Sequence, residues 1–132
     1  MIFGIGTDVV EIRRIDEAYE RFALHFVARL LMPEERVLFD ARALKSRGHA
    51  VRFLAQRFAA KEAIVKALGT GFAHGMWIRD CGVLPNAWGR PEVVWSPRGE
   101  QVRVALGAGA GHVTLTDEAG LVVAVAVLEK AS

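Results

Sequence analysis

The chain has 132 residues, of which 52% are hydrophobic and 24% are charged, and its formal net charge at pH 7 is +2. This composition is typical of a folded protein and excludes a disordered or low-complexity chain. The single cysteine, Cys81, excludes an internal disulfide framework and a cysteine-rich zinc site. We expect one domain over residues 1–132, soluble and cytoplasmic, without a leader peptide or a membrane-spanning segment.

The first expected element is a strand over Ile2–Val10, in which β-forming residues surround Gly4 and Gly6. Glycines inside a strand indicate close approach of another backbone or of a ligand. The strand also carries Asp8, whose burial is costly unless it is paired or binds a metal; a turn aspartate is the alternative. The segment GIGTD matches half of a dinucleotide-binding fingerprint, but no third glycine follows, which argues against a Rossmann fold.

Three helices are expected next. Apolar residues at helical spacing predict a helix over Ile12–Leu31, and a proline followed by two glutamates opens a second helix over Pro33–Leu44. After a turn, a third and longer helix is expected over Ala50–Leu68, closed by the glycine-threonine-glycine segment at 69–71.

The second half of the chain is expected to be mostly strand. The expected elements are two short strands, one short helix and two strands of a closing hairpin: Ile78–Leu84, Glu92–Trp95, Arg98–Leu106, His112–Thr116 and Leu121–Glu129. Strands at both ends with helices between them indicate an α+β fold, in which a mostly antiparallel small sheet wraps around the long central helix.

The central helix carries charges that a packed helix should not carry. One of its faces is apolar and the opposite face is made of alanines, so both sides can be covered. Glu62 is the only acid among seven basic residues between positions 42 and 66. A lone carboxylate in such a setting is a candidate for metal or phosphate chemistry. The basic run also fits nucleic acid or a solvated helix face, although it lacks the interleaved aromatic residues that stack on bases.

Four segments of the chain resemble holo-acyl-carrier-protein synthase, the short bacterial type of 4′-phosphopantetheinyl transferase. They are GIGTDVVEIRRI at 4–15, RFAAKEAIVKALGTG at 57–71, GRP at 89–91 and HVTLTDE at 112–118. The resemblance implies transfer of phosphopantetheine from coenzyme A to a serine of apo acyl carrier protein, with release of adenosine 3′,5′-bisphosphate. It further implies a Mg²⁺ cofactor and a homotrimer with active sites at subunit interfaces.

The resemblance also implies roles for individual residues. Asp8 and Glu62 match the two metal ligands and Lys66 a phosphate contact, which makes these three the catalytic candidates; a simple ion pair between Glu62 and Lys66 is the alternative. Glu62, or a water that it polarises, is the candidate base for the serine proton. The candidate coenzyme A contacts are Arg57, Lys66, Gly69, Pro91 and His112. A histidine at a strand edge with no ligand is the alternative for His112.

Arg13, Arg14 and Arg21 are interpreted as a docking face for the acidic carrier protein, with ordinary solvated arginines as the alternative. Many relatives carry histidine where this chain has Asp117, so we leave Asp117 out of the site. Two other functions stay open: a non-catalytic module that binds coenzyme A or a nucleotide, and a nucleic-acid-binding protein that uses the basic run. We expect neither nucleic acid nor a membrane as a partner.

Overall fold

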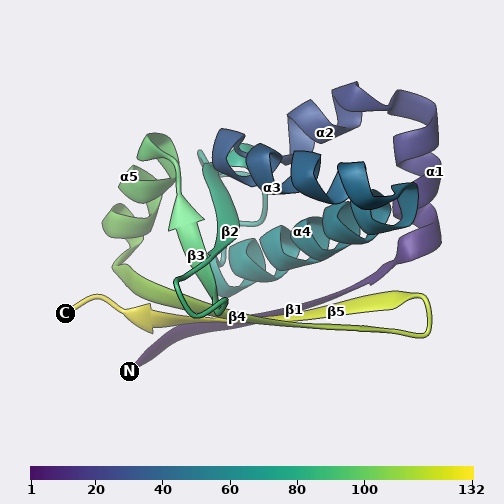
Figure 1. Ribbon diagram of the computed structural model, residues 1–132. Helices are drawn as coiled ribbons and strands as arrows, with labels where there is room; N and C mark the ends of the chain where they lie inside the picture. The colour runs from purple at the N-terminus through teal and green to yellow at the C-terminus, as the bar shows by residue number, and fades with distance from the viewer.

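The fold, described here for all of residues 1–132 in a computed structural model, is a five-stranded antiparallel sheet packed against helices. In chain order the elements are β1 (Ile2–Glu11), α1 (Ile12–Phe22), α2 (Leu24–Leu30), α3 (Pro33–Lys45), α4 (Arg47–Leu68), a 3₁₀ turn (Ile78–Asp80), β2 (Cys81–Pro85), β3 (Pro91–Trp95), α5 (Pro97–Leu106), β4 (Ala108–Glu118) and β5 (Leu121–Lys130). Figure 1 shows α4 lying along the long strands, with α1, α2 and α3 stacked beyond it. The expected α+β fold with a long central helix is therefore confirmed. No helix is both long enough and apolar enough to cross a membrane.

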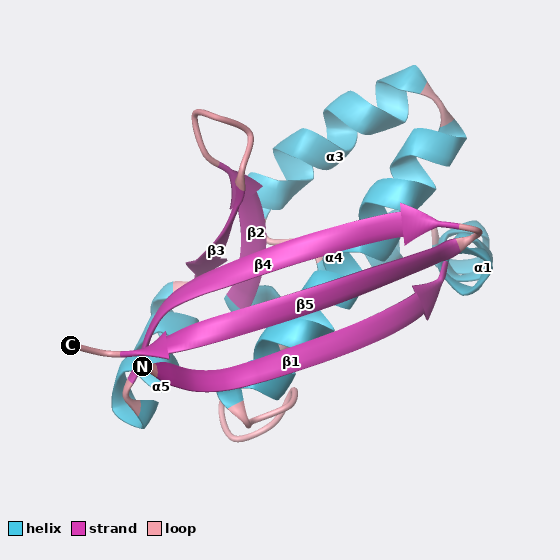
Figure 2. Ribbon diagram, turned by 90° about the horizontal axis from the view of Figure 1, so that it is seen from below, coloured by secondary structure: helices cyan, strands magenta, loops and turns pink.

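The strands are ordered β1-β5-β4-β3-β2, and each neighbouring pair is antiparallel. In β5, alternate residues from Val122 to Leu128 are buried, as the two-residue period of a strand requires when one face meets the core. These residues face α4. The opposite face of β1, β5 and β4 has no helix over it, as Figure 2 shows.

Two glycines bring β1 against α4. A Cβ on Gly6 would lie 2.0 Å from the carbonyl oxygen of Ala63, and one on Gly4 would lie 1.9 Å from that of Ala67. Only glycine fits at either position, so of the two alternatives expected from the sequence, a backbone or a ligand, the structure shows a backbone. The small alanines of α4 and these glycines together hold Asp8 directly beside the helix.

The largest departure from the expected elements lies at Ala23. The helix expected over residues 12–31 is divided there into α1 and α2, because Ala23 adopts φ 49° and ψ −127°. The break turns the chain so that Val27 and Leu30 of α2 become buried. No glycine or proline marks this position, so the apolar spacing alone predicted one continuous helix.

Three elements begin three or four residues away from their expected starts. The central helix begins at Arg47 instead of Ala50, because the Ser46 hydroxyl caps it by accepting from the His49 N–H at 3.1 Å. Strand β2 begins at Cys81, since residues 78–80 form a 3₁₀ turn. The glycine-rich segment after α5 is the start of β4 and not only a helix stop.

Candidate active site

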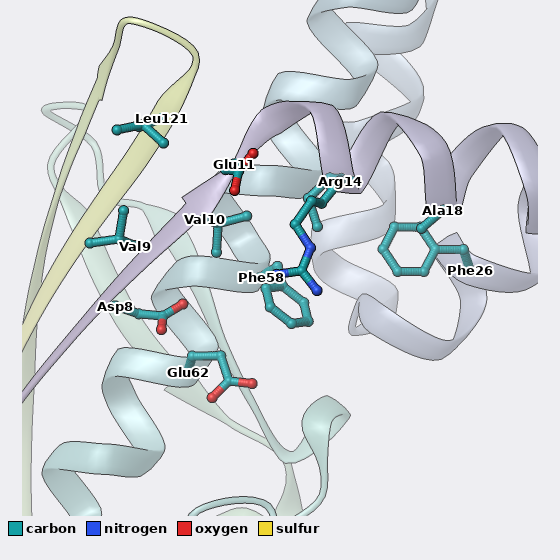
Figure 3. Close-up of a pocket in the computed structure, with 11 residues that line it drawn as sticks. Asp8, Val9, Val10, Glu11, Arg14, Ala18, Phe26, Phe58, Glu62 and Leu121 are labelled. Atoms are coloured by element: carbon teal, nitrogen blue, oxygen red, sulfur yellow. The ribbon is translucent and has the colours of Figure 1, made fainter.

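Asp8 on β1 and Glu62 on α4 line the same cavity, which has a volume of about 640 Å³. Figure 3 shows their carboxylates on the same side of the strand and helix, with the guanidinium of Arg14 directed toward them from α1. The apolar part of the cavity wall includes Phe26 and Phe58. The structure therefore brings together two acids that are 54 positions apart in the sequence.

The electrostatics of this cavity disfavour the ionised form of Glu62. Burial raises the pKa of Glu62, the negative charge of Asp8 raises it further, and the positive charge of Lys66 opposes both effects. A cation between the two carboxylates would remove their mutual repulsion.

Lys66 contacts Asp8 and not Glu62. Its ammonium group lies 3.1 Å from the Asp8 Oδ1 and donates a second hydrogen bond of 2.9 Å to the carbonyl oxygen of Thr7. The i,i+4 pair with Glu62, considered as the alternative from the sequence, is not formed. The Lys66 side chain is about half exposed (51%) and does not itself line the cavity, so it is connected to the cavity only through its contact with Asp8.

The residues present fit Mg²⁺. This ion commonly takes one or two carboxylates and completes its octahedron with waters and phosphate oxygens. No cluster of three or more histidine, cysteine, aspartate or glutamate side chains could enclose a metal by protein ligands alone. Asp8 and Glu62 thus suit an ion that shares its coordination with a phosphorylated substrate.

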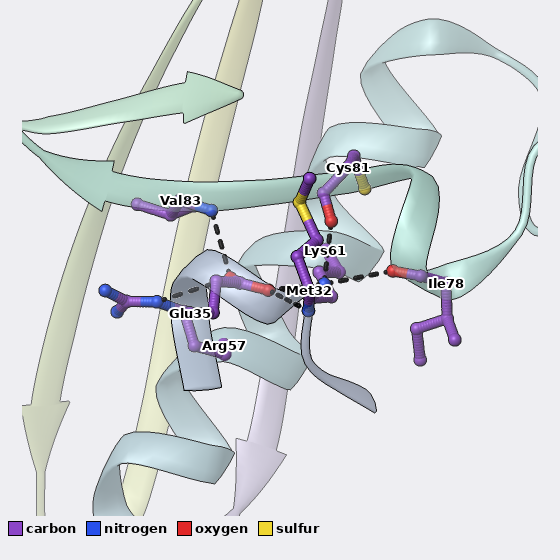
Figure 4. A network of polar contacts seen from close by, with 7 residues as sticks. All are labelled: Met32, Glu35, Arg57, Lys61, Ile78, Cys81 and Val83. Carbon is purple, nitrogen blue, oxygen red and sulfur yellow. Dashed lines mark hydrogen bonds and ion pairs between the residues drawn. The ribbon is translucent and has the colours of Figure 1, made fainter. Parts of the chain in front are cut away.

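Arg57 lies in a different part of the molecule, within a buried polar network on the α3 side of α4 (Figure 4). Its Nε is 3.5 Å from the Oε2 of Glu35, and its guanidinium lies 4.4 Å from the centre of the Phe53 ring. Burial lowers the pKa of Arg57, and the Glu35 carboxylate counteracts that effect. Arg57 does not line the cavity of Asp8 and Glu62.

The other candidate coenzyme A contacts are also spread over the molecule. Gly69 ends α4 in a left-handed conformation, with φ 87°, one turn after Lys66. Pro91 is the first residue of β3. His112 pairs with Val127 of β5, which places it on the uncovered sheet face, where its Nε2 lies 2.6 Å from the Glu129 Oε2. None of these three residues lines the cavity.

The three arginines of the expected docking face differ in their surroundings. Arg13 lies near two acids, at 3.7 Å from Glu11 and 4.0 Å from Glu17. Arg14 has no ion pair and lines the cavity, while Arg21 has no ion pair and lies 5.2 Å from the centre of the Phe22 ring. Arg14 and Arg21 are therefore the arginines of α1 that are free to meet an acidic partner.

Two polar partnerships escaped the sequence analysis. Glu35 is fully buried at the centre of the network with Arg57, although its place in the first turn of α3 suggested only a favourable charge at a helix start. Arg52 of α4 pairs with Asp117 of β4 at 2.9 Å, so the residue left out of the site has a structural partner. Neither partnership has a signal in the local sequence.

Comparison with known proteins places the chain in a superfamily of transferases. The sequence profile of the 4′-phosphopantetheinyl transferase superfamily matches residues 4–126 of the chain. A holo-acyl-carrier-protein synthase of Halorhodospira halophila is 41% identical over 128 residues, which are 97% of this chain and 98% of that relative.

Solved structures agree with the sequence matches. The crystal structure of holo-acyl-carrier-protein synthase from Neisseria meningitidis superposes with a TM-score of 0.89 at 38% identity, covering 98% of this chain and 100% of that one. The Helicobacter pylori synthase in complex with coenzyme A has a TM-score of 0.80 at 27% identity, covering 95% and 99%. The chain therefore belongs to the holo-acyl-carrier-protein synthase family, as its four motifs indicated.

Proposed function

We propose that this chain transfers the 4′-phosphopantetheine group of coenzyme A to a serine of apo acyl carrier protein. The serine oxygen forms a bond to the phosphorus that carries pantetheine. The bond from that phosphorus to the bridging oxygen breaks, and adenosine 3′,5′-bisphosphate leaves. The observation that carries the proposal is the meeting of Asp8 and Glu62 in one cavity beside Arg14. The similar Helicobacter pylori synthase, solved in complex with coenzyme A, supports coenzyme A as the donor.

Asp8 and Glu62 would hold the Mg²⁺ ion. When bound, Mg²⁺ neutralises charge on the pyrophosphate oxygens during transfer. Lys66 lies beside Asp8 and would place its ammonium near the leaving bisphosphate, where negative charge develops. Glu62, or a water that it orients, is our candidate acceptor for the serine proton, because it lines the cavity and is only partly buried.

We further propose that the active site is completed by a second subunit of a homotrimer. Within one chain, Pro91 and His112 lie outside the cavity, and we assign their contacts with coenzyme A to a neighbouring copy. The uncovered sheet face offers a surface for such an assembly, because Ile5 and Val9 on β1 are 58% and 60% exposed.

We place the protein in the cytoplasm, consistent with a lone buried cysteine and no disulfide.

The test is incubation of the protein with coenzyme A, Mg²⁺ and an apo acyl carrier protein, followed by mass spectrometry of the carrier. The expected result is a phosphopantetheine mass gain on the carrier's serine. Absence of that gain would overturn the proposal. Calorimetric binding of coenzyme A without any gain would indicate a non-catalytic binding module instead.

A further inference from the structure

Helix α1 is not basic by composition. It contains three arginines and three acids, so its formal charge is zero; they are Arg13, Arg14, Arg21, Asp16, Glu17 and Glu20. An acidic carrier protein approaching this helix would meet no net attraction unless the acids were neutralised from elsewhere.

The neutralising residue is Arg47, at the start of α4, which packs against α1 (Figure 1). Its Nη2 lies 2.7 Å from the Asp16 Oδ1 and 2.9 Å from the Glu20 Oε2. The guanidinium also lies 5.0 Å from the centre of the Tyr19 ring, which fixes its position over the helix. One arginine outside α1 thus binds two of the three acids of α1.

The third acid, Glu17, is 4.0 Å from Arg13, so every acid of α1 has a basic partner. Arg14 and Arg21 are seven positions apart, about two helical turns, and therefore lie on one side of α1. Neither of these two guanidinium groups has an intramolecular ion pair.

We propose that Arg47 is a positioning residue for docking of the carrier protein: by neutralising Asp16 and Glu20, it keeps these acids from offsetting the attraction of Arg14 and Arg21 for the carrier's acids. This inference rests on the proposed function, which supplies the acidic partner. Arg47 itself need not touch the carrier. Its effect is on the charge of the docking face.

We do not expect the loss of Arg47 to act on carrier docking through the stability of the fold. The side chains of Arg47, Asp16 and Glu20 are 49%, 51% and 76% exposed, and ion pairs of such exposure contribute little to folding. Encounter with a charged partner depends instead on the summed charge of the surface. Glu20 and Arg21 lie in the same shallow surface depression as Arg47, so losing Arg47 would leave negative charge next to Arg21.

The test measures transfer while the carrier and coenzyme A concentrations are varied separately. Arg47→Ala should raise the KM for the carrier by about five- to tenfold, with the KM for coenzyme A and kcat nearly unchanged. Arg47→Lys keeps the positive charge, so its KM for the carrier should stay close to that of the parent protein. The difference between Arg47→Ala and the parent protein should shrink as ionic strength rises, because salt screens exposed charges.

A rescue variant separates charge masking from tethering of α1. Adding Asp16→Asn and Glu20→Gln to Arg47→Ala removes the acids that Arg47 masks, so the carrier KM should return to its parent value. The matched control is Arg36→Ala on α3, which breaks an exposed pair with Asp40 and should leave the carrier KM unchanged.

Each unfavourable outcome has a distinct meaning. An unchanged carrier KM in Arg47→Ala would overturn the inference. A carrier KM that stays high in the triple variant would also overturn it, because Arg47 would then act by holding α1 in place. If the parent protein modifies no carrier at all, the proposed function fails first, and the inference fails with it.

Discussion

The ammonium group of Lys61 lies 2.8 Å from the Oε1 of Glu35, and neither side chain is exposed to solvent. Lys61 also donates to the carbonyl oxygens of Ile78 at 3.0 Å and Cys81 at 2.7 Å. Glu35 accepts from the N–H groups of Met32 and Val83, as Figure 4 shows. This pair therefore connects α4 to α3 and β2. The next residue of α4, Glu62, points to a different side of the helix, into the cavity that it shares with Asp8.

We expect Lys61→Met to destabilise the fold by about 3–5 kcal/mol, because it leaves the Glu35 carboxylate buried without its closest cation. It also removes the donor for two carbonyl groups. The measurement is the free energy of unfolding in urea.

Lys45→Met is the matched control, since Lys45 is an exposed helix lysine without an ion pair, and its unfolding free energy should change by less than about 0.5 kcal/mol. A loss in Lys61→Met as small as that of the control would contradict a role for the buried pair in stability.

We expect Gly6→Ala to separate β1 from α4. The new Cβ would lie 2.0 Å from the Ala63 carbonyl oxygen and 2.7 Å from the Ala67 nitrogen, and both are backbone atoms of a packed helix. The cost should be about 1–3 kcal/mol of unfolding free energy. Because Asp8 follows on the same strand, the transfer rate should fall as well.

Gly48→Ala is the control for this substitution. Only the Ser46 Oγ, at 3.7 Å, lies near the added Cβ, and alanine is the better helix residue, so this variant should be neutral or stabilised by up to about 1 kcal/mol. If Gly6→Ala unfolds at the same urea concentration as the parent protein, β1 and α4 are not held together as tightly as the glycines indicate.

Local signals in the sequence account for most of the fold. The two-residue and helical periodicities predicted the strands and helices, and the glycines of β1 predicted the approach of a second backbone. That approach is what places Asp8 beside Glu62, but only the family motifs indicated that these two acids would meet.

Contacts between distant residues outside the family motifs could not be predicted. Nothing near Glu35 indicates that its partner is Lys61, 26 positions later, and nothing near Arg47 indicates that it binds Asp16, 31 positions earlier. The break at Ala23 has no proline or glycine to announce it. Each of these features depends on how helices pack, and apolar spacing describes only which side of a helix is buried.

Asp80 should make stability depend on pH in the acid range. Burial alone raises the pKa of Asp80, but hydrogen bonds from Ser96, the Trp77 N–H and Arg98 outweigh it and leave that pKa below its ordinary value. The ionised carboxylate therefore stabilises the fold above about pH 4, and this contribution is lost as the pH falls through the folded-state pKa.

We expect Asp80→Asn to cost about 1–3 kcal/mol at pH 7 and progressively less toward pH 3. The measurement is urea unfolding of both proteins across that range, and their stability curves should converge at low pH. Asp40→Asn, which alters an exposed pair with Arg36, should shift stability little at any pH. Parallel curves for Asp80→Asn and the parent protein would contradict a depressed pKa at Asp80.

If Asp8 and Glu62 hold the metal ion, removing either charge should lower activity. Asp8→Asn and Glu62→Gln keep the shape of each side chain and remove its charge, so each should lower kcat/KM by at least about 100-fold at limiting Mg²⁺. Chelation should abolish transfer by the parent protein, and added Mg²⁺ should restore it. Glu34→Gln, which alters an exposed acid of α3, should behave like the parent protein.

Glu62→Gln should lower activity without lowering the stability of the fold. In the metal-free protein, burial and the charge of Asp8 both disfavour ionised Glu62, so removing its charge should leave the free energy of unfolding unchanged or raised. Calorimetry should show weaker Mg²⁺ binding by the same variant, a readout that does not depend on turnover. Near-normal transfer by either variant at limiting Mg²⁺ would show that these carboxylates do not hold the ion, because a two-carboxylate site cannot lose one ligand without losing affinity.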